Sequence, residues 1–181
     1  MSASPEASLS RAYSAFRIPD DPSECQCNLL ARAEALGRQL QSRPFEYVLC
    51  HTDIHAANIL VSEAGEIYLV DWDGPLLAPR ERDLLFIVGS CIARHTEPGE
   101  EALFFQSYGA VEIDWTALAY YRYERAIEDL GEVAQRVFWD TEMSDEARAW
   151  EMELAVRLFQ PGHIVDSALE ADGVPGRERP V

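Results

Sequence analysis

The sequence HTDIHAANILVSEAGEIYLVDWD, residues 51–73, decides the fold of this chain. Two short apolar runs, 58–62 and 67–71, flank the turn sequence EAGE, in which Gly65 supplies a conformation that other residues rarely adopt. Apolar runs of this length on either side of a glycine-containing turn are typical of a β-hairpin. The segment therefore predicts a hairpin with a polar cluster before its first strand and another after its second.

Three polar residues stand at the ends of these two strands. Asp53 precedes the hairpin, Asn58 lies five positions later at the start of its first strand, and Asp71 ends its second strand. Because a hairpin brings its two ends together, we expect the three side chains to converge. One carboxylate can then accept a proton, while the amide oxygen and the second carboxylate share a hard cation such as magnesium. Phosphoryl transfer uses this set, and protein kinases have the same five-residue spacing.

Outward from the hairpin, the pattern predicts one more strand and several helices. FEYVLC, residues 45–50, is rich in aromatic and β-branched residues and is expected to be a strand. Trp72 and Trp115 are expected in the core. This order of elements predicts an α+β fold, mostly helical with a small β-hairpin layer. The expected helices run from Ser23 to before Pro44 and over 81–93, 101–109, 114–139 and 144–159.

Composition divides the chain into one domain and two terminal segments. Residues 1–22 are rich in Ser, Ala, Pro and Asp and are expected to be a flexible arm, with a flexible tail at 171–181. Residues 23–170 are then the folded domain. The first residues lack the basic start and apolar stretch of a signal peptide, and the cysteine spacing favours free thiols. We therefore expect a cytoplasmic protein.

The motifs resemble those of a known family. The segment 51–73 is similar to the H-G-D-x-H-x-x-N and I-D-W signature of aminoglycoside phosphotransferases, which have a protein-kinase-like fold. DWDGPLLAPRERDLLF and LAYYRYERAIEDL extend the resemblance, which covers roughly residues 45–165 and is strongest to the spectinomycin phosphotransferase branch. Family members phosphorylate hydroxyl groups of cationic antibiotics, and others act on choline. The resemblance implies ATP, or GTP, and Mg²⁺ as cofactors.

The resemblance also implies roles for individual residues. Asp53 would be the catalytic base, and Asn58 and Asp71 would bind magnesium. Asp73 would be a second carboxylate on the metal side. Three further residues are expected to support the site: His51 braces the loop through backbone hydrogen bonds, His55 supports it or contacts phosphate, and Asp83 caps or braces the helix that follows.

Acidic residues on the helix YYRYERAIEDL have two interpretations. Glu124, Glu128 and Asp129 can form an acidic wall for an ammonium group of the substrate. Alternatively, the spacings from Glu124 to Glu128 and from Arg125 to Asp129 are those of an ordinary solvated helix surface.

The net charge of the chain is strongly negative. It has 32 acidic and 15 basic residues, a formal net charge of -17, and every basic residue is Arg. An acidic surface repels nucleic acid and anionic membranes, so we expect neither as a partner. It attracts cationic ligands, which agrees with a small cationic substrate, although it also serves solubility alone.

The sequence lacks the features of one part of a kinase. Kinase-like enzymes have an N-terminal lobe in which a lysine and a flexible loop hold the phosphates of ATP, and this sequence has neither before His51. The chain is therefore expected to be a kinase-like C-terminal lobe without its ATP-gripping lobe. We expect it to be a truncated or inactive fragment, or to depend on a separate chain that supplies the missing lobe.

Two other functions remain open at the level of sequence. The pattern H-x-D-x-H at His51, Asp53 and His55 can ligate zinc or iron in a metal-dependent hydrolase, although this leaves Asn58 and Asp71 unused. A non-catalytic module that binds cationic ligands in an acidic cleft is the second alternative.

Overall fold

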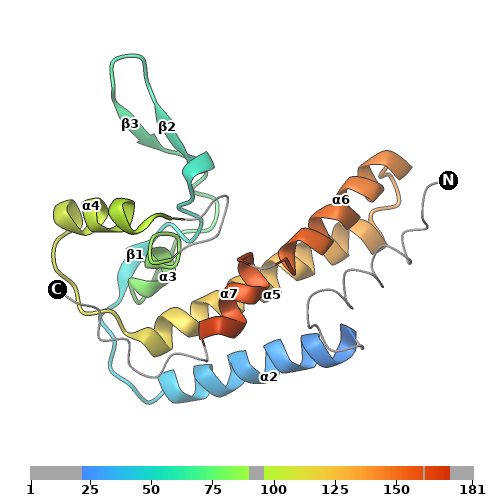
Figure 1. Ribbon diagram of the computed structural model, residues 1–181, viewed down its shortest axis with the longest axis horizontal. Coiled ribbons are helices and arrows are strands. Elements are labelled where there is room, and N and C mark those ends of the chain that lie inside the picture. Colours follow the sequence, from blue (N-terminus) through green and yellow to red (C-terminus); the bar gives the residue numbers. More distant parts are fainter. Residues whose placement is uncertain (1–21, 90–95, 161, 172–181) are drawn as a thin grey trace. The chain divides into compact units, whose positions relative to one another are not determined.

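The computed structural model describes residues 22–89, 96–160 and 162–171, which are coloured in Figure 1. The chain divides into two compact units. The hairpin unit is Leu36–Tyr121, and the helical unit consists of the described residues up to Ala35 together with those from Arg122 onward. Two helices contribute residues to both units: α2 (Pro22–Leu40) and α5 (Trp115–Trp139).

The hairpin unit contains two small antiparallel sheets. Strand β1 (Val48–Cys50) pairs with β4 (Leu76–Ala78), and β2 (Ile59–Val61) pairs with β3 (Ile67–Leu69). The expected strand and hairpin are thus confirmed, in shortened form. Strand β4 was not predicted, because three residues are too few to show the alternation that marks a strand.

The β2–β3 hairpin encloses the turn that its sequence predicts. Its register pairs Leu60 with Tyr68, and Gly65 has a φ of 82°, which glycine adopts without steric cost. All six strand residues are exposed, from Ile59 and Leu69 at 38% to Ile67 at 69%. The hairpin projects away from α3 (Glu81–Leu84) and α4 (Pro98–Tyr108), as Figure 1 shows.

The core of the hairpin unit lies beneath β1 and β4. Phe45, Val48 and Ile54 pack against it from the strand side, and Phe104 and Phe105 pack against it from α4. It is built from the following buried residues: Cys50, Ala78, Leu84, Leu85, Phe86, Val88, Ala117, Leu118 and Tyr121. Cys50 at the end of β1 and Leu84 at the end of α3 both belong to this core. The polar loop after β1 and the segment after β3 lie between these two elements in the sequence.

Helix α5 begins where the sequence predicts. The Asp114 carboxylate accepts hydrogen bonds from the N–H groups of Thr116 and Ala117 at 2.9 and 3.1 Å, the contacts of an N-cap. Arg43 donates to the same carboxylate, and the shorter of the two contacts is 2.8 Å. The backbone N–H of Asp114 donates to the Glu81 carboxylate over 3.0 Å, which joins this helix start to α3.

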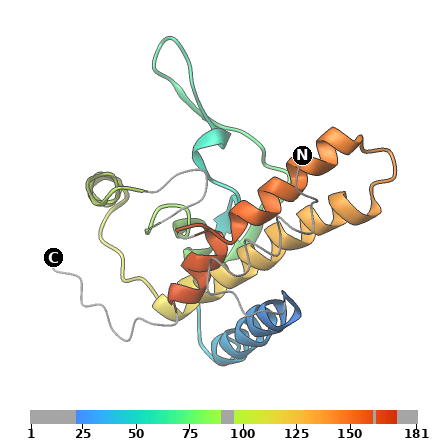
Figure 2. The same ribbon diagram turned by 45° about the vertical axis from the view of Figure 1, so that its right-hand side comes forward.

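The helical unit is formed around the C-terminal part of α5. Helix α6 (Asp145–Leu158) runs beside it in Figures 1 and 2, and Arg136 of α5 pairs with Glu151 of α6 at 3.0 Å. Arg148 donates to the carbonyl oxygens of Val137 and Asp140 at the end of α5. Helix α7 (Ile164–Glu170) follows and was not predicted; its three buried residues are Ile164, Val165 and Ala168.

Several sequence-based expectations require correction. The helix expected over 81–93 is helical only at Glu81–Leu84, because a series of turns over 85–89 follows it and 90–95 lie outside the described residues. Trp72 and Trp115 are 45% and 41% exposed and are not core residues. The flexible arm and tail fall outside the described residues, apart from Pro22 and Ala171. No helix in the described ranges is long and apolar enough to cross a membrane.

Candidate active site

The loop that follows β1 is fixed by the carboxylate of Asp83. The backbone N–H groups of His51 and Thr52 each donate to this carboxylate, one to Oδ2 and one to Oδ1, both over 2.8 Å. Hydrogen bonds to a charged group are roughly twice as strong as neutral ones. Asp83 was expected to cap or brace the helix that follows it. It instead braces the loop, a contact that joins residues more than thirty positions apart and that sequence periodicity does not reveal.

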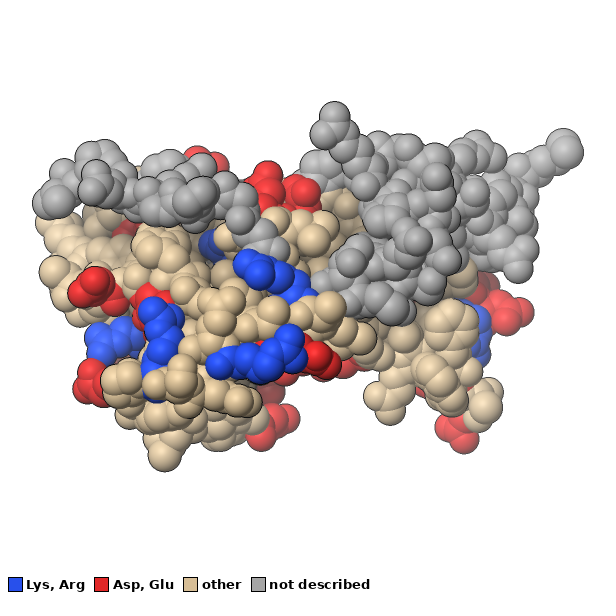
Figure 3. Space-filling view, turned by 90° about the horizontal axis from the view of Figure 1, so that it is seen from below, with Lys and Arg blue, Asp and Glu red and all other residues tan. Residues whose placement is uncertain are grey.

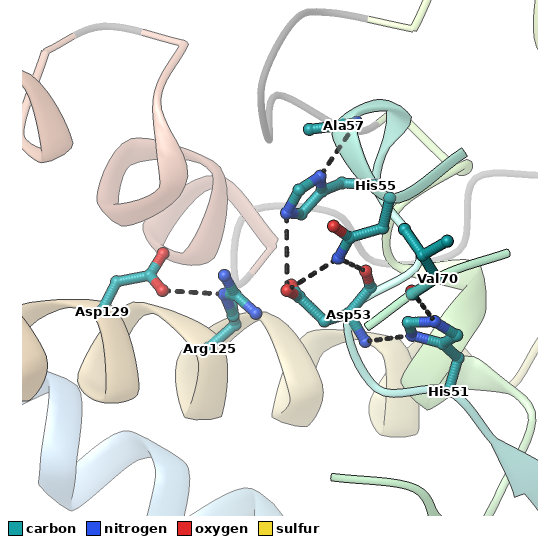
Figure 4. A network of polar contacts seen from close by, with 8 residues as sticks. His51, Asp53, His55, Ala57, Val70, Arg125 and Asp129 are labelled. Atoms are coloured by element: carbon teal, nitrogen blue, oxygen red, sulfur yellow. Dashed lines mark hydrogen bonds and ion pairs between the residues drawn. The ribbon is translucent and has the colours of Figure 1, made fainter. Parts of the chain in front are cut away.

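The ring of His51 connects this loop to the end of the hairpin. Its Nδ1 accepts from the N–H of Asp53 at 3.3 Å, so the proton lies on Nε2, which donates to the carbonyl oxygen of Val70 over 2.9 Å. Both ring nitrogens are thereby used, as Figure 4 shows. The ring also lies against Trp72, with 4.5 Å between ring centroids. This arrangement agrees with the expected bracing role of His51.

Asn58 and His55 both contact the carboxylate of Asp53. The side-chain amide of Asn58 donates to the Asp53 carbonyl oxygen at 2.8 Å and to its Oδ2 at 3.2 Å. His55 accepts from the N–H of Ala57 through Nδ1, and its Nε2 lies 3.4 Å from the same Oδ2. Figure 4 shows these contacts around Asp53. Asn58 belongs to the short 3₁₀-helix η1 (Ala56–Asn58), which makes the turn into β2.

Backbone hydrogen bonds bring Asp71 to the same end of the hairpin. The N–H of Val70 donates to the carbonyl oxygen of Asn58 over 3.0 Å, and the carbonyl of Val70 accepts from His51. Asp71 follows directly, with a φ of 66°, a left-handed conformation that Asp tolerates better than most residues. Asp71 and Asp73 are both exposed. The backbone thus brings Asp53, Asn58 and Val70, the residue before Asp71, to one end of the hairpin, while the convergence of the Asp71 side chain stays a prediction.

Thr52 is a second residue with left-handed backbone. Its φ is 75°, a strained value for a β-branched residue that costs about 1–3 kcal/mol when it persists. Its hydroxyl donates to the carbonyl oxygen of Gly74 over 3.1 Å. Sequence reasoning missed Thr52, although a signal was available: the H-G-D signature that the loop resembles has Gly at this position.

The contacts of this loop leave an oxygen atom better placed for a cation than the histidine nitrogens. Since the Asn58 amide nitrogen is directed at Asp53, its Oδ1 is the atom that can ligate a cation. Oxygen ligands are those of Mg²⁺. Zinc binding through H-x-D-x-H is disfavoured, because both His51 nitrogens are engaged. Across the part of the chain that the structure describes, no three or more His, Cys, Asp and Glu side chains gather to hold a metal.

The thiol of Cys50 lies directly before this loop. Burial raises its pKa to about 11, and the nearby Asp83 carboxylate acts in the same direction. The thiol therefore stays protonated at neutral pH and lies within 3.7 Å of the Pro79 carbonyl oxygen. Cys50 is free, as expected; the other three cysteines lie outside the residues whose side chains are described.

The acidic residues of α5 lie in the helical unit. Asp129 forms an ion pair with Arg125 at 2.8 Å, four positions apart on the helix. Burial raises the pKa of Asp129 to about 6, while Arg125 acts in the opposite direction. Arg125 and Asp129, which are four positions apart as on an ordinary helix surface, therefore form an ion pair in the structure. Figure 3 shows that acidic and basic side chains are interspersed on the face it displays.

The chain is similar to phosphotransferases of known family and structure. The family model described as "Phosphotransferase enzyme family" matches residues 3–121, which include every residue of the loop and hairpin. The crystal structure of spectinomycin phosphotransferase APH(9)-Ia in complex with ADP and spectinomycin has a TM-score of 0.71 and 31% sequence identity. The match covers 95% of this chain and 50% of that one.

Two further structures are similar. The AMP-bound complex of the same spectinomycin phosphotransferase has 32% identity and a TM-score of 0.70, over 92% of this chain and 49% of that chain. Choline kinase LicA from Streptococcus pneumoniae has 19% identity and a TM-score of 0.52, over 87% and 55%, and shows a shared fold alone. The chain thus spans about half the length of these proteins, with a mixed helical and small-sheet architecture that corresponds to part of a kinase-like fold.

Proposed function

Because this chain belongs to the phosphotransferase enzyme family, we propose that it carries the catalytic lobe of an ATP-dependent phosphotransferase. The acceptor is a hydroxyl group of a small cationic molecule, such as an aminoglycoside or an aminocyclitol. One observation carries the proposal. The loop with Asp53 and the hairpin end with Asn58 and Asp71 are joined by hydrogen bonds through the side chains of His51 and Asn58.

Asp53 acts as the base that orients the acceptor hydroxyl and accepts its proton. Its carboxylate is positioned by Asn58 and His55, and its backbone N–H by His51. A carboxylate held by two neighbours on a fixed backbone loses little orientational freedom when a substrate binds. Phosphoryl transfer depends mainly on such positioning and on charge stabilisation, and requires little covalent chemistry from the protein.

Asn58, Asp71 and Asp73 hold the magnesium ion of the nucleotide. When bound, Mg²⁺ neutralises charge on the phosphates of the donor. Asn58 is 8% exposed and fixed by Asp53, whereas Asp71 and Asp73 are exposed. The buried amide is therefore the fixed ligand, and the two carboxylates approach the ion from an accessible segment.

Groups outside this chain add to the hold on the nucleotide that its magnesium site provides. The similar spectinomycin phosphotransferase structures contain ADP or AMP, and this chain spans about half of their length. The chain has no Lys to contact the phosphates. In this proposal a separate chain supplies the ATP-gripping lobe.

The cationic substrate is attracted by carboxylates. The net charge of -17 and the acidic residues Glu124 and Glu128 of α5 support a substrate with ammonium groups, whereas Asp129, expected in the same acidic wall, is paired with Arg125. Spectinomycin is bound by the similar phosphotransferase structure, and an aminocyclitol of this class is the first acceptor to test.

The test is phosphoryl transfer detected by mass spectrometry of the acceptor. Each reaction contains ATP, Mg²⁺ and spectinomycin. Three mixtures are compared: the chain alone, the chain with the half of spectinomycin phosphotransferase that has no counterpart here, and that half alone. We expect phosphorylated product in at least one mixture that contains the chain, and none with Asp53→Asn, whose side chain has the same shape. The exposed variant Asp145→Asn is the control. Product from Asp53→Asn at the normal rate, or none from the normal chain in any mixture, contradicts the proposal.

A further inference from the structure

We propose that Thr52 is a positioning residue, whose hydroxyl fixes the segment bearing Asp71 and Asp73 against the loop that bears Asp53. This inference rests on the proposed function for its meaning, because it concerns the residues to which that proposal assigns magnesium binding. Thr52 itself does not touch the reacting groups; it acts through the carbonyl oxygen of Gly74.

The segment 71–73 is held at both of its ends by the same loop. On one side is Val70, whose N–H donates to Asn58 and whose carbonyl accepts from His51. On the other side is Gly74, whose carbonyl oxygen accepts from the hydroxyl of Thr52 over 3.1 Å. The exposed carboxylates between these two attachments therefore have limited freedom, which is the condition for two carboxylates on a short segment to hold one cation.

Gly74 lies beside Thr52, and this approach does not depend on the absence of a side chain at position 74. A Cβ atom added at Gly74 would lie 3.5 Å from Oγ1 of Thr52, in ordinary van der Waals contact. The two residues are 22 positions apart in sequence and lie just beyond Cys50 and Leu76, the last pair of the β1–β4 sheet, so the hydrogen bond extends that contact to the segment that follows β3.

The strained backbone conformation of Thr52 indicates that its side chain has a role that glycine would not fill. At a φ of 75° a glycine would fit without strain, whereas threonine is strained there. The signature that the loop resembles has glycine at this position. The Asp83 carboxylate accepts from the Thr52 N–H at 2.8 Å, which holds the backbone in the strained conformation. The hydroxyl is then aimed at Gly74 by a fixed backbone.

Loss of the Thr52 hydroxyl should weaken cation binding more than it disturbs the position of the proposed base, Asp53. Asp53 is positioned by His51, His55 and Asn58, and none of these contacts involves the Thr52 side chain. Thr52→Val keeps the branched shape and the same backbone strain, and removes the hydroxyl alone. Thr52→Ser keeps the hydroxyl. The expected pattern is a change in Mg²⁺ affinity in the valine variant and its rescue in the serine variant.

The experiment combines two measurements on the full chain. NMR order parameters of the backbone amides of 71–74 report how rigidly the Thr52 hydrogen bond holds this segment. Titration with Mg²⁺ in the presence of ADP reports the Mg²⁺ affinity. In Thr52→Val we expect lower order parameters in this segment and about fivefold weaker Mg²⁺ binding, the factor that one net hydrogen bond is worth. Thr52→Ser should match the normal chain, as should the exposed control Thr141→Val.

The two measurements separate the failure of this inference from that of the proposed function. Unchanged order parameters in Thr52→Val, or a serine variant that behaves like the valine variant, overturn the inference. Unchanged Mg²⁺ affinity in Thr52→Val, with binding present in the normal chain, also overturns it. If the normal chain binds no Mg²⁺, the magnesium site of the proposed function is wrong, while the order parameters still decide whether Thr52 ties the segment.

Discussion

The side-chain amide of Asn58 donates to both the backbone carbonyl oxygen and the carboxylate of Asp53, over 2.8 and 3.2 Å. Both hydrogens of the amide are thus directed at one residue. This fixes the orientation of the amide, because a carbonyl and a carboxylate can only accept. The residue that we propose as the base and the residue that we propose as a metal ligand are therefore one hydrogen-bonded pair.

Removal of the Asn58 amide should lower stability as well as cation binding. Asn58 is 8% exposed, and Asn58→Ala leaves the Asp53 carbonyl without its partner in a partly buried place. We expect the free energy of unfolding to fall by about 1–2 kcal/mol, measured by urea denaturation. Gln106→Ala removes an exposed amide from α4 and is the control. Equal effects of the two changes would show that the Asn58 contacts do not stabilise the loop.

Substitution of Asp83 should be more costly than that of Asn58. Its carboxylate accepts from two backbone N–H groups, those of His51 and Thr52. Asp83→Ala leaves both unpaired, and we expect a loss of about 3 kcal/mol in urea denaturation. Asp83→Asn keeps one acceptor oxygen and should lose less. If both variants unfold at the same urea concentration as the normal chain, Asp83 does not brace the loop.

Two apolar substitutions should have very different costs. Leu85 is 1% exposed in the core of the hairpin unit, and Leu85→Ala should lower the free energy of unfolding by about 2–5 kcal/mol. Ile67 is 69% exposed on the hairpin, so Ile67→Ala should cost less than about 1 kcal/mol. Thermal or urea unfolding compares them directly. A larger cost for Ile67→Ala would mean that the face of the hairpin is covered in solution.

The stability of the chain should depend on pH through Asp129. Burial raises the pKa of its carboxyl from 3.8 to about 6, while Arg125 acts in the opposite direction. Because the folded state then binds the proton more tightly than the unfolded state, the contribution of Asp129 to stability falls as pH rises through this range. Asp129→Asn removes this dependence.

We predict that the difference in the free energy of unfolding between Asp129→Asn and the normal chain changes with pH. At pH 7 the free energy of unfolding of the variant, relative to the normal chain, should be higher than at pH 4 by on the order of 2 kcal/mol. Urea unfolding at both pH values measures it, with Asp145→Asn as a control for the removal of one exposed carboxylate. A difference that is the same at both pH values would refute the prediction.

The hairpin and its consequences were predictable from sequence because they depend on local patterns. The apolar runs around Gly65 give the hairpin, and its geometry brings Asn58 and Val70, the residue before Asp71, to the same end. The N-cap at Asp114 was likewise readable, since it depends on residues two and three positions away.

Contacts between distant segments were not predictable. Asp83 accepts from the loop after β1, and Thr52 donates to Gly74, but neither pairing leaves a periodic signal in the sequence. Strand β4 is too short to alternate and is defined by its partner β1. The apolar segment after Glu81 suggested a long helix, yet its residues are buried in turns, because an apolar stretch indicates burial without fixing the secondary structure.

The most direct test of the central claim is calorimetric titration of the chain with ATP, with and without Mg²⁺. If Asn58 and Asp71 hold the magnesium of a nucleotide beside Asp53, binding should require Mg²⁺ and should weaken about tenfold or more in Asn58→Ala and Asp71→Ala. Asp145→Asn should bind as the normal chain does. Absence of any magnesium-dependent binding, or equal affinity in the normal chain and both site variants, would contradict the claim.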